Sequence, residues 1–598
     1  MSTATGRLHG RSSDPTALKR GSEDEPERGP GGARRLLERL GSFWRSLDQP
    51  VVGRRVPGSA VVGLTGLLLS CVAALLAYRT GSNTWYADSL SHLTIARRIF
   101  DSQVPGFQQL GTVWLPLPHL LLIPFVASRW MWSSGVGASL LGAGCAAATA
   151  TAVYRIAARL GFGRAGRLVA VLVLWTNVSY LYICTTALTE PVLIAAFACT
   201  IAGLVHWATA TRPMSGGELA VFAGLPAMVA MLSRYEGWVL VISMVIYIAA
   251  VEYRRVRGQT PHPWRFVTLR RVLPALAAPA FGILCPFVGV GWWLAYNYAI
   301  YHDPLEFMTG PYSALRQQAD DIARGIVTTK GNLGISLTVY DWSLWEILGG
   351  VVVVAGALGF LLLFFSEGFS TRVMTLGLAF STYVFMIASL YLGQTVIWND
   401  HSMPQSLWNV RFAVSPIIFF ALGTAALVDR LGGWIRRMPY VPGAARRALA
   451  AGPAAIVAVA LLTQFGWWAR DPETRSPVVA EGHLSLVLRP TKVIDYLRQH
   501  YDGGHILMNE SAPRNAIIPL VGLPNKDYWD VSTGAGYDAA LKSPTTHATW
   551  IVVNTDLHTD YPDPVYLYMR QHRELFASYT IAATDGSEVL YHLDRWTP

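Results

Sequence analysis

The sequence predicts an α-helical polytopic membrane protein that carries a C-terminal extracytoplasmic α/β domain. Three observations support this fold class. The mean hydropathy is +0.33, the apolar residues gather in blocks of about 18 or more, and the last 130 residues change to a mixed pattern of short elements. Only 14% of the 598 residues are charged, whereas soluble globular chains have about 25%. This composition excludes an ordinary soluble enzyme, a collagen-like chain and a wholly disordered chain.

The N-terminal segment differs from the rest of the chain. Residues 1–57 are rich in Gly, Ser, Pro, Arg and Glu and have almost no apolar periodicity, which is typical of disorder. The first apolar block begins too late for a signal peptide. We therefore expect a disordered cytoplasmic tail over residues 1–57.

A transmembrane module is expected over residues 58–468, with about 11 membrane-spanning helices. The candidate spans lie near 58–79, 135–157, 167–186, 190–209, 219–234, 236–252, 272–298, 345–365, 373–393, 412–428 and 449–468. The stretch 115–132 is also apolar, but its three prolines each remove a helix hydrogen bond. We expect it to lie at the outer interface, within a large first external loop over 80–134.

The distribution of charge predicts the orientation. Clusters of arginine at 155–167, 254–271 and 430–447 alternate with loops that are poor in Lys and Arg. The tail and the loops on its side carry 28 basic and 11 acidic residues, and the remainder carries 20 basic and 27 acidic residues. By the positive-inside rule the N-terminus is cytoplasmic in a cell inner (plasma) membrane. The net charge of +10 is thus a signal of topology, and no nucleic-acid partner is expected.

Residues 469–598 are expected to form the extracytoplasmic α/β domain. Helix-like stretches at 491–501 and 565–576 alternate with strand-like runs at 505–508, 549–554, 578–583 and 588–593. The segment contains no GxGxxG and no P-loop motif, so a nucleotide site is unsupported.

The first candidate for chemistry is Asp88, in the first external loop. It lies four residues before His92 in a helix-like segment, so the two side chains share one face. A carboxylate at a bilayer surface can act as a general base toward an incoming hydroxyl. The competing interpretation is a helix cap, because Asp is also well suited to that position.

Further charged residues are expected at the same outer membrane face as Asp88. Glu190 lies in the turn between the third and fourth spans, Arg234, Tyr235 and Glu236 between the fifth and sixth, and Arg411 before the tenth. Each of them also has a structural interpretation, as an internal ion pair or as an arginine that reaches the interface. Their common side is the informative feature, because a charge at a membrane helix marks function.

These motifs resemble those of the polytopic GT-C glycosyltransferases that use polyprenyl-phosphate sugars, especially the protein O-mannosyltransferase and aminoarabinose-transferase-like group. The resemblance covers residues 58–470. It rests on Tyr86-Ala87-Asp88, Trp114-Leu115-Pro116-Leu117-Pro118, Glu190-Pro191, Arg234-Tyr235-Glu236, and Val410-Arg411-Phe412 with Pro416.

The resemblance implies a membrane glycosyltransferase that moves a sugar from a polyprenyl-phosphate donor to an extracytoplasmic hydroxyl, with inversion. Asp88 would be the general base. The donor phosphate and sugar would be bound by Arg411, Arg234, Glu190, Glu236, Tyr235 and His92. The acceptor would be a polysaccharide, a glycolipid or a protein. Many mannosyltransferases of the family have a second acid where this chain has Ser89, which weakens the case for a protein acceptor.

A metal remains open at this point. His92 and His119 could join Asp88 around a divalent cation, but two histidines are not a full ligand set. Two other functional classes also stay open: a polytopic transporter or flippase, which should place charges at the midplane, and a non-catalytic cell-envelope assembly protein.

Overall fold

The computed structural model describes residues 55–594 except 213, 259–268, 311–312, 441, 512 and 560–561, together with positions 38, 42, 47, 51 and 53. The predicted tail over 1–57 therefore lies almost entirely outside the described residues. The chain divides into two compact units, Met1–Leu47 and Asp48–Pro598, and the description below concerns the second.

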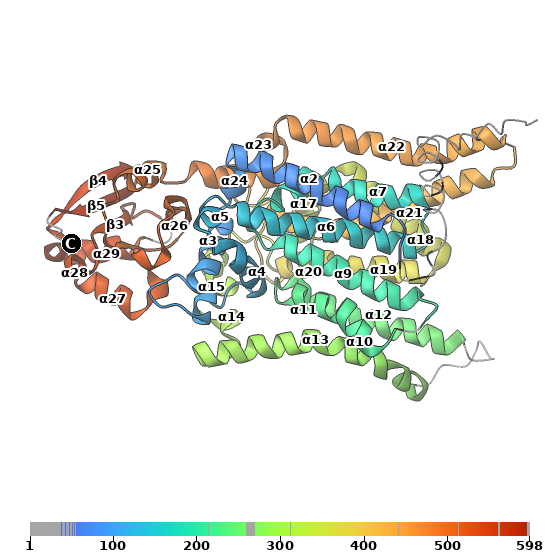
Figure 1. Cartoon of the computed structure of the whole chain (residues 1–598), viewed down its shortest axis with the longest axis horizontal. Coiled ribbons are helices and arrows are strands. Elements are labelled where there is room, and N and C mark those ends of the chain that lie inside the picture. Colours follow the sequence, from blue (N-terminus) through green and yellow to red (C-terminus); the bar gives the residue numbers. More distant parts are fainter. Residues whose placement is uncertain are drawn as a thin grey trace, which may run out of the picture. The chain divides into compact units, whose positions relative to one another are not determined.

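Among the described residues, eight helical segments are long and apolar enough to cross a membrane. Each coincides with one of the predicted spans (Figure 1). They are α2 (Ser59–Thr80), α6 (Val136–Arg159), α9 (Glu190–Thr209), α13 (Leu269–Tyr301), α18 (Gly350–Glu367), α19 with α20 (Thr371–Ala379 and Ser381–Tyr391), η4 with α21 (Val410–Val414 and Ile417–Arg437), and α22 (Gly443–Arg470).

The other three predicted spans have different forms. Residues 167–186 form α7 (Arg164–Trp175) and α8 (Val178–Ile183), which are separated because the Asn177 side chain caps the second helix by accepting from Tyr180 N. Residues 219–234 fall in three short pieces, α10 (Gly216–Leu219), the π turn η3 (Ala220–Gly224) and α11 (Leu225–Met231). The third, residues 236–252, forms one 23-residue helix, α12 (Glu236–Gly258).

The proline-containing stretch 115–132 does not cross the module. It forms α4 (Leu117–Val126) and α5 (Arg129–Ser133), which are 10 and 5 residues long. An α-helix rises about 1.5 Å per residue, so neither reaches across a hydrocarbon core of about 30 Å.

Glycines allow the central helices to approach closely. Gly356 and Gly359 of α18 face Gly423 of α21, where an added Cβ would meet backbone atoms of the facing helix. In lipid no hydrophobic driving force brings helices together, so their association depends on close packing, which small residues at such crossings allow. Residues from α6, α9, α18 and α21 share one large apolar core.

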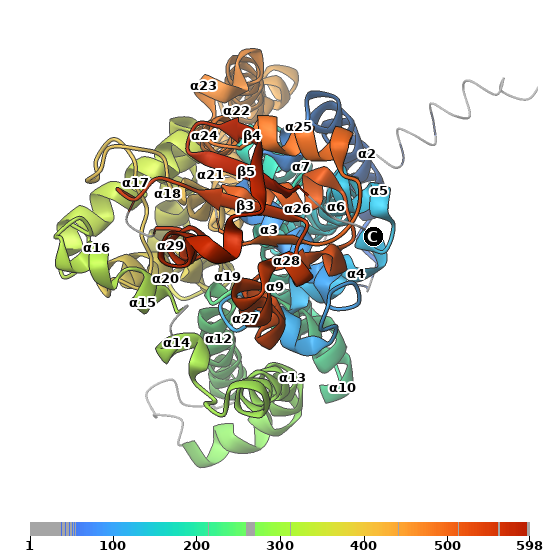
Figure 2. The same ribbon diagram turned by 90° about the vertical axis from the view of Figure 1, so that its left-hand side faces the viewer.

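The C-terminal region contains a five-stranded sheet of order β2-β1-β3-β5-β4. Figure 2 shows three of its strands, β3, β5 and β4, next to one another. β1 (Ile506–Met508), β2 (Tyr528–Trp529) and β3 (Trp550–Asn554) are parallel, whereas β5 (Glu588–Leu593) pairs antiparallel with β3 and β4 (Tyr579–Asp585). Every strand predicted here is present, and the two-residue β2 is an addition.

The sheet region packs directly on the helical module. Leu90 and Leu93 of α3 (Ala87–Arg98) belong to the same apolar cluster as Ile506 of β1 and Ile517 of α26 (Ile517–Val521). Three more elements of this region are α24 (Pro477–Val487), α25 (Thr491–His500) and η5 (Arg514–Ala516). The helix that carries Asp88 is therefore covered by C-terminal residues.

Candidate active site

Asp88 is the second residue of α3, and its side chain does not cap that helix. The N-cap position is Tyr86, and no side-chain cap hydrogen bond is made there. The interpretation of Asp88 as a helix cap is therefore wrong. A negative charge in the first turn is still favoured by the helix dipole. The carboxylate is free to point toward neighbouring elements, where it pairs with Arg411.

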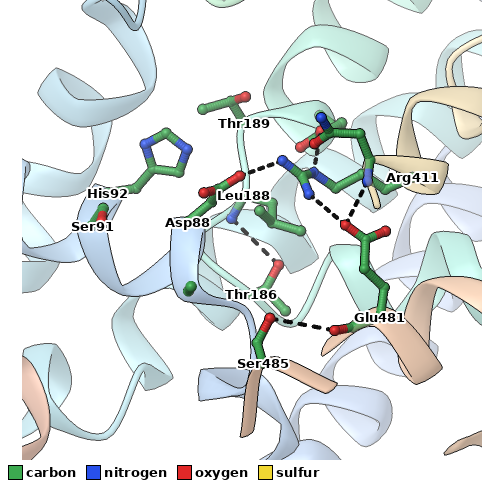
Figure 3. Close-up of polar contacts among 12 residues, drawn as sticks. Asp88, Ser91, His92, Thr186, Leu188, Thr189, Arg411, Glu481 and Ser485 are labelled. Atoms are coloured by element: carbon green, nitrogen blue, oxygen red, sulfur yellow. Dashed lines mark hydrogen bonds and ion pairs between the residues drawn. The ribbon is translucent and has the colours of Figure 1, made fainter. Parts of the chain in front are cut away.

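Arg411 is the centre of a network of ion pairs (Figure 3). Its Nη2 donates to Asp88 Oδ2, its Nε to Glu190 Oε1 at 3.1 Å, and its Nη1 to Glu481 Oε1 at 3.0 Å. The guanidinium carbon also lies 5.1 Å from the centre of the Tyr86 ring. All three guanidinium nitrogens thus donate to carboxylates, which fixes the orientation of the side chain.

Glu481 belongs to this network although no sequence motif marked it. It lies on α24 and also accepts from the backbone nitrogens of Asn409 at 2.8 Å and Val410 at 3.1 Å. Asn409 adopts a left-handed conformation with φ 56°, which Asn tolerates better than most residues. Burial raises the pKa of Glu481, and Arg411 opposes this effect. The segment 469–598, expected as a separate domain, thus contributes a side chain to the site.

Close packing places Glu481 beside Arg411. The next residue, Gly482, faces Tyr86 and Tyr182, and a Cβ there would lie 2.5 Å from the Tyr182 hydroxyl oxygen. A glycine at this position lets α24 pack here without displacing the two tyrosine side chains. The signal in the sequence is weak, a single acid and a glycine within an apolar helix.

Arg234 extends the network through the carboxylate that it shares with Arg411. Its Nη1 donates to Glu190 Oε1 at 3.0 Å and to Thr189 Oγ1 at 3.1 Å, and its Nε donates to Glu236 Oε1 at 3.0 Å. Arg234 also stacks on Phe412, the neighbour of Arg411, at 4.5 Å from the ring centre. Its Nη2 has no hydrogen-bond partner within the described part of the chain.

The sequence predicted that Asp88, Glu190, Arg234, Glu236 and Arg411 converge, and they form this one continuous network. Their exposures differ in a way that bears on chemistry. The Asp88 side chain is 31% exposed, while those of Glu190, Glu236 and Glu481 are 0–4% exposed. Asp88 is therefore the carboxylate of the network that an incoming molecule can reach.

His92 lies one turn after Asp88, as the spacing predicted. Its Nδ1 is 2.9 Å from His119 Nε2, and its ring packs 4.5 Å from the centre of the Trp114 ring. Burial, helped by the charges of Arg411 and Arg234, lowers the pKa of His92 to about 3. Burial likewise lowers the pKa of His119. The two rings form a neutral hydrogen-bonded pair beside the network.

Tyr235 points away from the ion pairs. Its ring stacks on Phe307 at 5.8 Å, and its hydroxyl donates to Val113 O at 3.5 Å. It belongs to an aromatic cluster that also includes Trp238 and Trp293. Of the predicted site residues, His92 lies beside the network without a hydrogen bond to it among the described residues, and Tyr235 packs in the aromatic cluster.

The candidate metal ligands Asp88, His92 and His119 do not form a metal site. Among the described residues, no group of three or more His, Cys, Asp or Glu could hold an ion. The facing nitrogens of His92 and His119 engage each other, so they do not join Asp88 as ligands.

Neither a protein-family model nor a curated protein sequence matches this chain. Solved structures do resemble it. The crystal structure of ArnT from Cupriavidus metallidurans bound to undecaprenyl phosphate has a TM-score of 0.51 at 13% identity, over 88% of this chain and 97% of that one. The apo state of the same protein gives a TM-score of 0.47 at 13% identity, over 89% and 98%. The arabinofuranosyltransferase AftD from mycobacteria gives 0.42 at 16% identity, over 92% of this chain and 40% of that one.

The likeness to undecaprenyl-phosphate-bound ArnT extends over nearly the whole of both chains. It confirms the predicted fold class, a polytopic helical module followed by a C-terminal α/β region. At 13% identity the likeness concerns the fold, and the roles of individual residues rest on the geometry described above.

Proposed function

We propose that this protein is a membrane glycosyltransferase that moves a sugar from a polyprenyl-phosphate donor to a hydroxyl of an extracytoplasmic acceptor. The observation that carries the proposal is the position of Asp88. It is the accessible carboxylate of an otherwise buried network, in a fold shared with a protein that binds undecaprenyl phosphate.

The chemistry follows from the groups present. The acceptor hydroxyl gives its proton to Asp88 as its oxygen attacks the anomeric carbon, and the bond from that carbon to the phosphate oxygen breaks on the opposite face. The configuration inverts, and polyprenyl phosphate leaves as an anion that needs no protonation. One catalytic carboxylate is then sufficient, in contrast to the pair used by glycosidases.

Asp88 has the geometry for this role. Its Oδ2 accepts from Arg411, and within the described part of the chain its Oδ1 has no hydrogen-bond partner. We assign Oδ1 to the acceptor hydroxyl and Arg411 to holding the carboxylate in place. General-base catalysis of this kind contributes about 10²–10⁴-fold to a rate.

The donor phosphate needs a cation near Asp88. Each of the three guanidinium nitrogens of Arg411 already donates to a carboxylate, so within the described part of the chain one N–H on Nη1 and one on Nη2 remain. Arg234 keeps Nη2 unengaged among the described residues, and Phe412 supports its planar group. We therefore assign the donor phosphate to Arg234, with Glu190 and Glu236 orienting it. His92 and Tyr235 remain candidates for contacts with the donor.

The test is transfer by Asp88→Asn in purified, lipid-reconstituted protein. The donors are polyprenyl-phosphate mannose and polyprenyl-phosphate arabinofuranose, and the binding of undecaprenyl phosphate is measured in parallel. We expect transfer to fall by about 10²-fold or more, while binding of the lipid phosphate is kept.

Asp101→Asn is the matched control. Asp101 follows the same helix and is also paired with an arginine, Arg97, at 2.7 Å, so this variant should retain transfer. Normal transfer by Asp88→Asn would overturn the role of Asp88 as general base, whereas no transfer by the wild type from either donor would favour a non-catalytic assembly protein.

A further inference from the structure

The first turn of α3, which carries Asp88, is tied to the C-terminal region by one side chain. Asn515 Nδ2 donates to Ala87 O at 2.7 Å and to Ser91 Oγ at 2.8 Å. These acceptors lie one residue before Asp88 and three residues after it. Asn515 therefore contacts the catalytic turn at residues that stand before and after Asp88 in the sequence.

The same turn is also tied on its other side. Ser89 is fully buried, and its Oγ accepts from Ala187 N at 2.8 Å, in the loop that leads to Glu190. The residue that stands where family members have a second acid thus faces the protein interior and fastens the turn. Asp88 is held between the loop before α9 and η5 of the C-terminal region.

A buried ion pair fixes Asn515 to the sheet. The neighbouring Arg514 pairs with Asp563 and donates to Ser511 Oγ at 2.8 Å. Asp563 in turn accepts from the backbone nitrogen of Asn554, the last residue of β3, at 2.8 Å. Arg514 and Asp563 are 4% and 1% exposed. A continuous path of polar contacts therefore runs from the end of β3 through Arg514 to the turn of Asp88.

We propose that Asn515 is a positioning residue for Asp88, and that the C-terminal α/β region is thereby part of the catalytic unit. This inference rests on the proposed function. The orientation of the first turn of α3 sets where Asp88 Oδ1 meets the acceptor hydroxyl. A shift of about 1 Å in a reacting group can cost about 10²-fold in rate, so the two hydrogen bonds from Asn515 bear directly on turnover.

The chain provides a matched control in Asn525. This residue is also a buried asparagine of the C-terminal region, and its Nδ2 donates to Thr94 O of the same helix at 3.3 Å. Each of the two asparagines has a buried Oδ1 that lacks a partner among the described residues. Asn525 differs in that Thr94 lies six residues beyond Asp88, so its loss should not move the catalytic turn.

The experiment compares Asn515→Ala, Asn515→Asp and Asn525→Ala in the full chain, with the donors named above. We expect Asn515→Ala to lower kcat per folded molecule by about 10-fold or more with an unchanged KM for the donor. Asn515→Asp is nearly isosteric, cannot donate to Ala87 O and adds a negative charge near Asp88. It should lower kcat and also move the acidic limb of the pH–rate profile to higher pH. Asn525→Ala should leave kcat and that limb as in the wild type.

Hydrogen exchange supplies a readout that needs no substrate. Peptides over residues 87–92 should exchange faster in Asn515→Ala than in the wild type and Asn525→Ala. Asn515→Gln, which keeps an amide donor, should restore part of the kcat. If Asn515→Asp does not fold, the alanine and glutamine variants carry the test.

The outcomes separate this inference from the proposed function. Suppose that Asp88→Asn abolishes transfer, and that Asn515→Ala and Asn525→Ala have equal kcat and equal exchange. The proposed function then stands, and the positioning role is overturned. If Asp88→Asn transfers normally, the general-base role of Asp88 and the positioning role of Asn515 both fail.

Discussion

Replacing Glu481 by glutamine perturbs the network at the residue that sequence motifs did not reveal. In the wild type its carboxylate accepts three hydrogen bonds, from Asn409 N, Val410 N and Arg411 Nη1. A glutamine whose carbonyl oxygen takes the place of Oε1 keeps the contacts with Asn409 N and Arg411. The side-chain amide nitrogen then faces Val410 N, and because both groups are donors no hydrogen bond forms between them.

The expected losses of stability and of transfer rate in Glu481→Gln follow from these contacts. An unsatisfied buried donor costs about 1–3 kcal/mol, and a hydrogen bond to a charged group is worth about 1.5–3 kcal/mol. Removal of a buried charge offsets part of the loss, which agrees with the raised pKa of Glu481. We expect a net destabilisation of about 2 kcal/mol and, because Arg411 loses an anchor, a fall of about 10-fold in transfer, or about 1.4 kcal/mol of barrier.

The assay pairs unfolding in lipid-detergent bicelles with transfer by folded protein. The control is Glu367→Gln, because Glu367 also bridges two arginines, Arg372 at 2.8 Å and Arg430, but lies at the end of α18 and outside the network. That variant should lose stability and keep transfer. If Glu481→Gln has the stability and the transfer rate of the wild type, the network does not depend on Glu481. The same holds if Glu481→Gln loses stability but keeps its transfer rate, as expected for Glu367→Gln.

Two further predictions concern pH and helix packing. The pKa of His92 is lowered from 6.5 to about 3, so below pH 6.5 the unfolded chain binds more protons and stability is lost as the pH falls toward 3. The pKa shift corresponds to about 5 kcal/mol of stability. Unfolding midpoints measured from pH 7 to pH 4 should fall more steeply for the wild type than for His92→Gln. Parallel curves for the two proteins would contradict the lowered pKa of His92. Gly423→Ala should destabilise the module by about 1–3 kcal/mol because its Cβ meets the backbone of Gly356. Gly433→Ala on the same helix has open space and should be neutral or stabilise by up to about 1 kcal/mol, and equal unfolding of the two variants would refute the packing argument.

The membrane spans could be predicted from the sequence because a long apolar block has few alternatives in a bilayer. The deviations have local causes. Asn177 caps α8 and so interrupts the span over 167–186, and the π turn Ala220–Gly224 breaks the regular helix within 219–234. Strand β2 has only two residues, which is too short for an alternating pattern to appear.

The network was partly predictable. Asp88, Glu190, Arg234, Glu236 and Arg411 stand at span ends on one side, and a charge there is costly unless it is paired. The predicted topology placed them at one membrane face, but it did not predict that they join in one network of ion pairs. Glu481 and Asn515 could not be predicted, because each reaches the site through tertiary packing of the C-terminal region, and neither has a neighbouring motif. The cap interpretation of Asp88 failed because Tyr86 occupies the N-cap position.

The charge of the network constrains where the leaving phosphate can bind. With every group ionised, Arg234 and Arg411 face four carboxylates, so the cluster is negative before any phosphate arrives. Within the described part of the chain Arg411 keeps one N–H on Nη1 and one on Nη2, on nitrogens that already hold Glu481 and Asp88, so a phosphate there would compete with those carboxylates. A buried charge left without its partner costs about 3–5 kcal/mol. Arg234 need release none, because its Nη2 is unengaged among the described residues. Both arginines donate to the same oxygen, Glu190 Oε1, so a phosphate on Arg234 weakens its hold on Glu190 and strengthens that of Arg411. Under the proposed function, arrival of the donor would then tighten the group that orients Asp88, and this coupling would give the two arginines distinct roles.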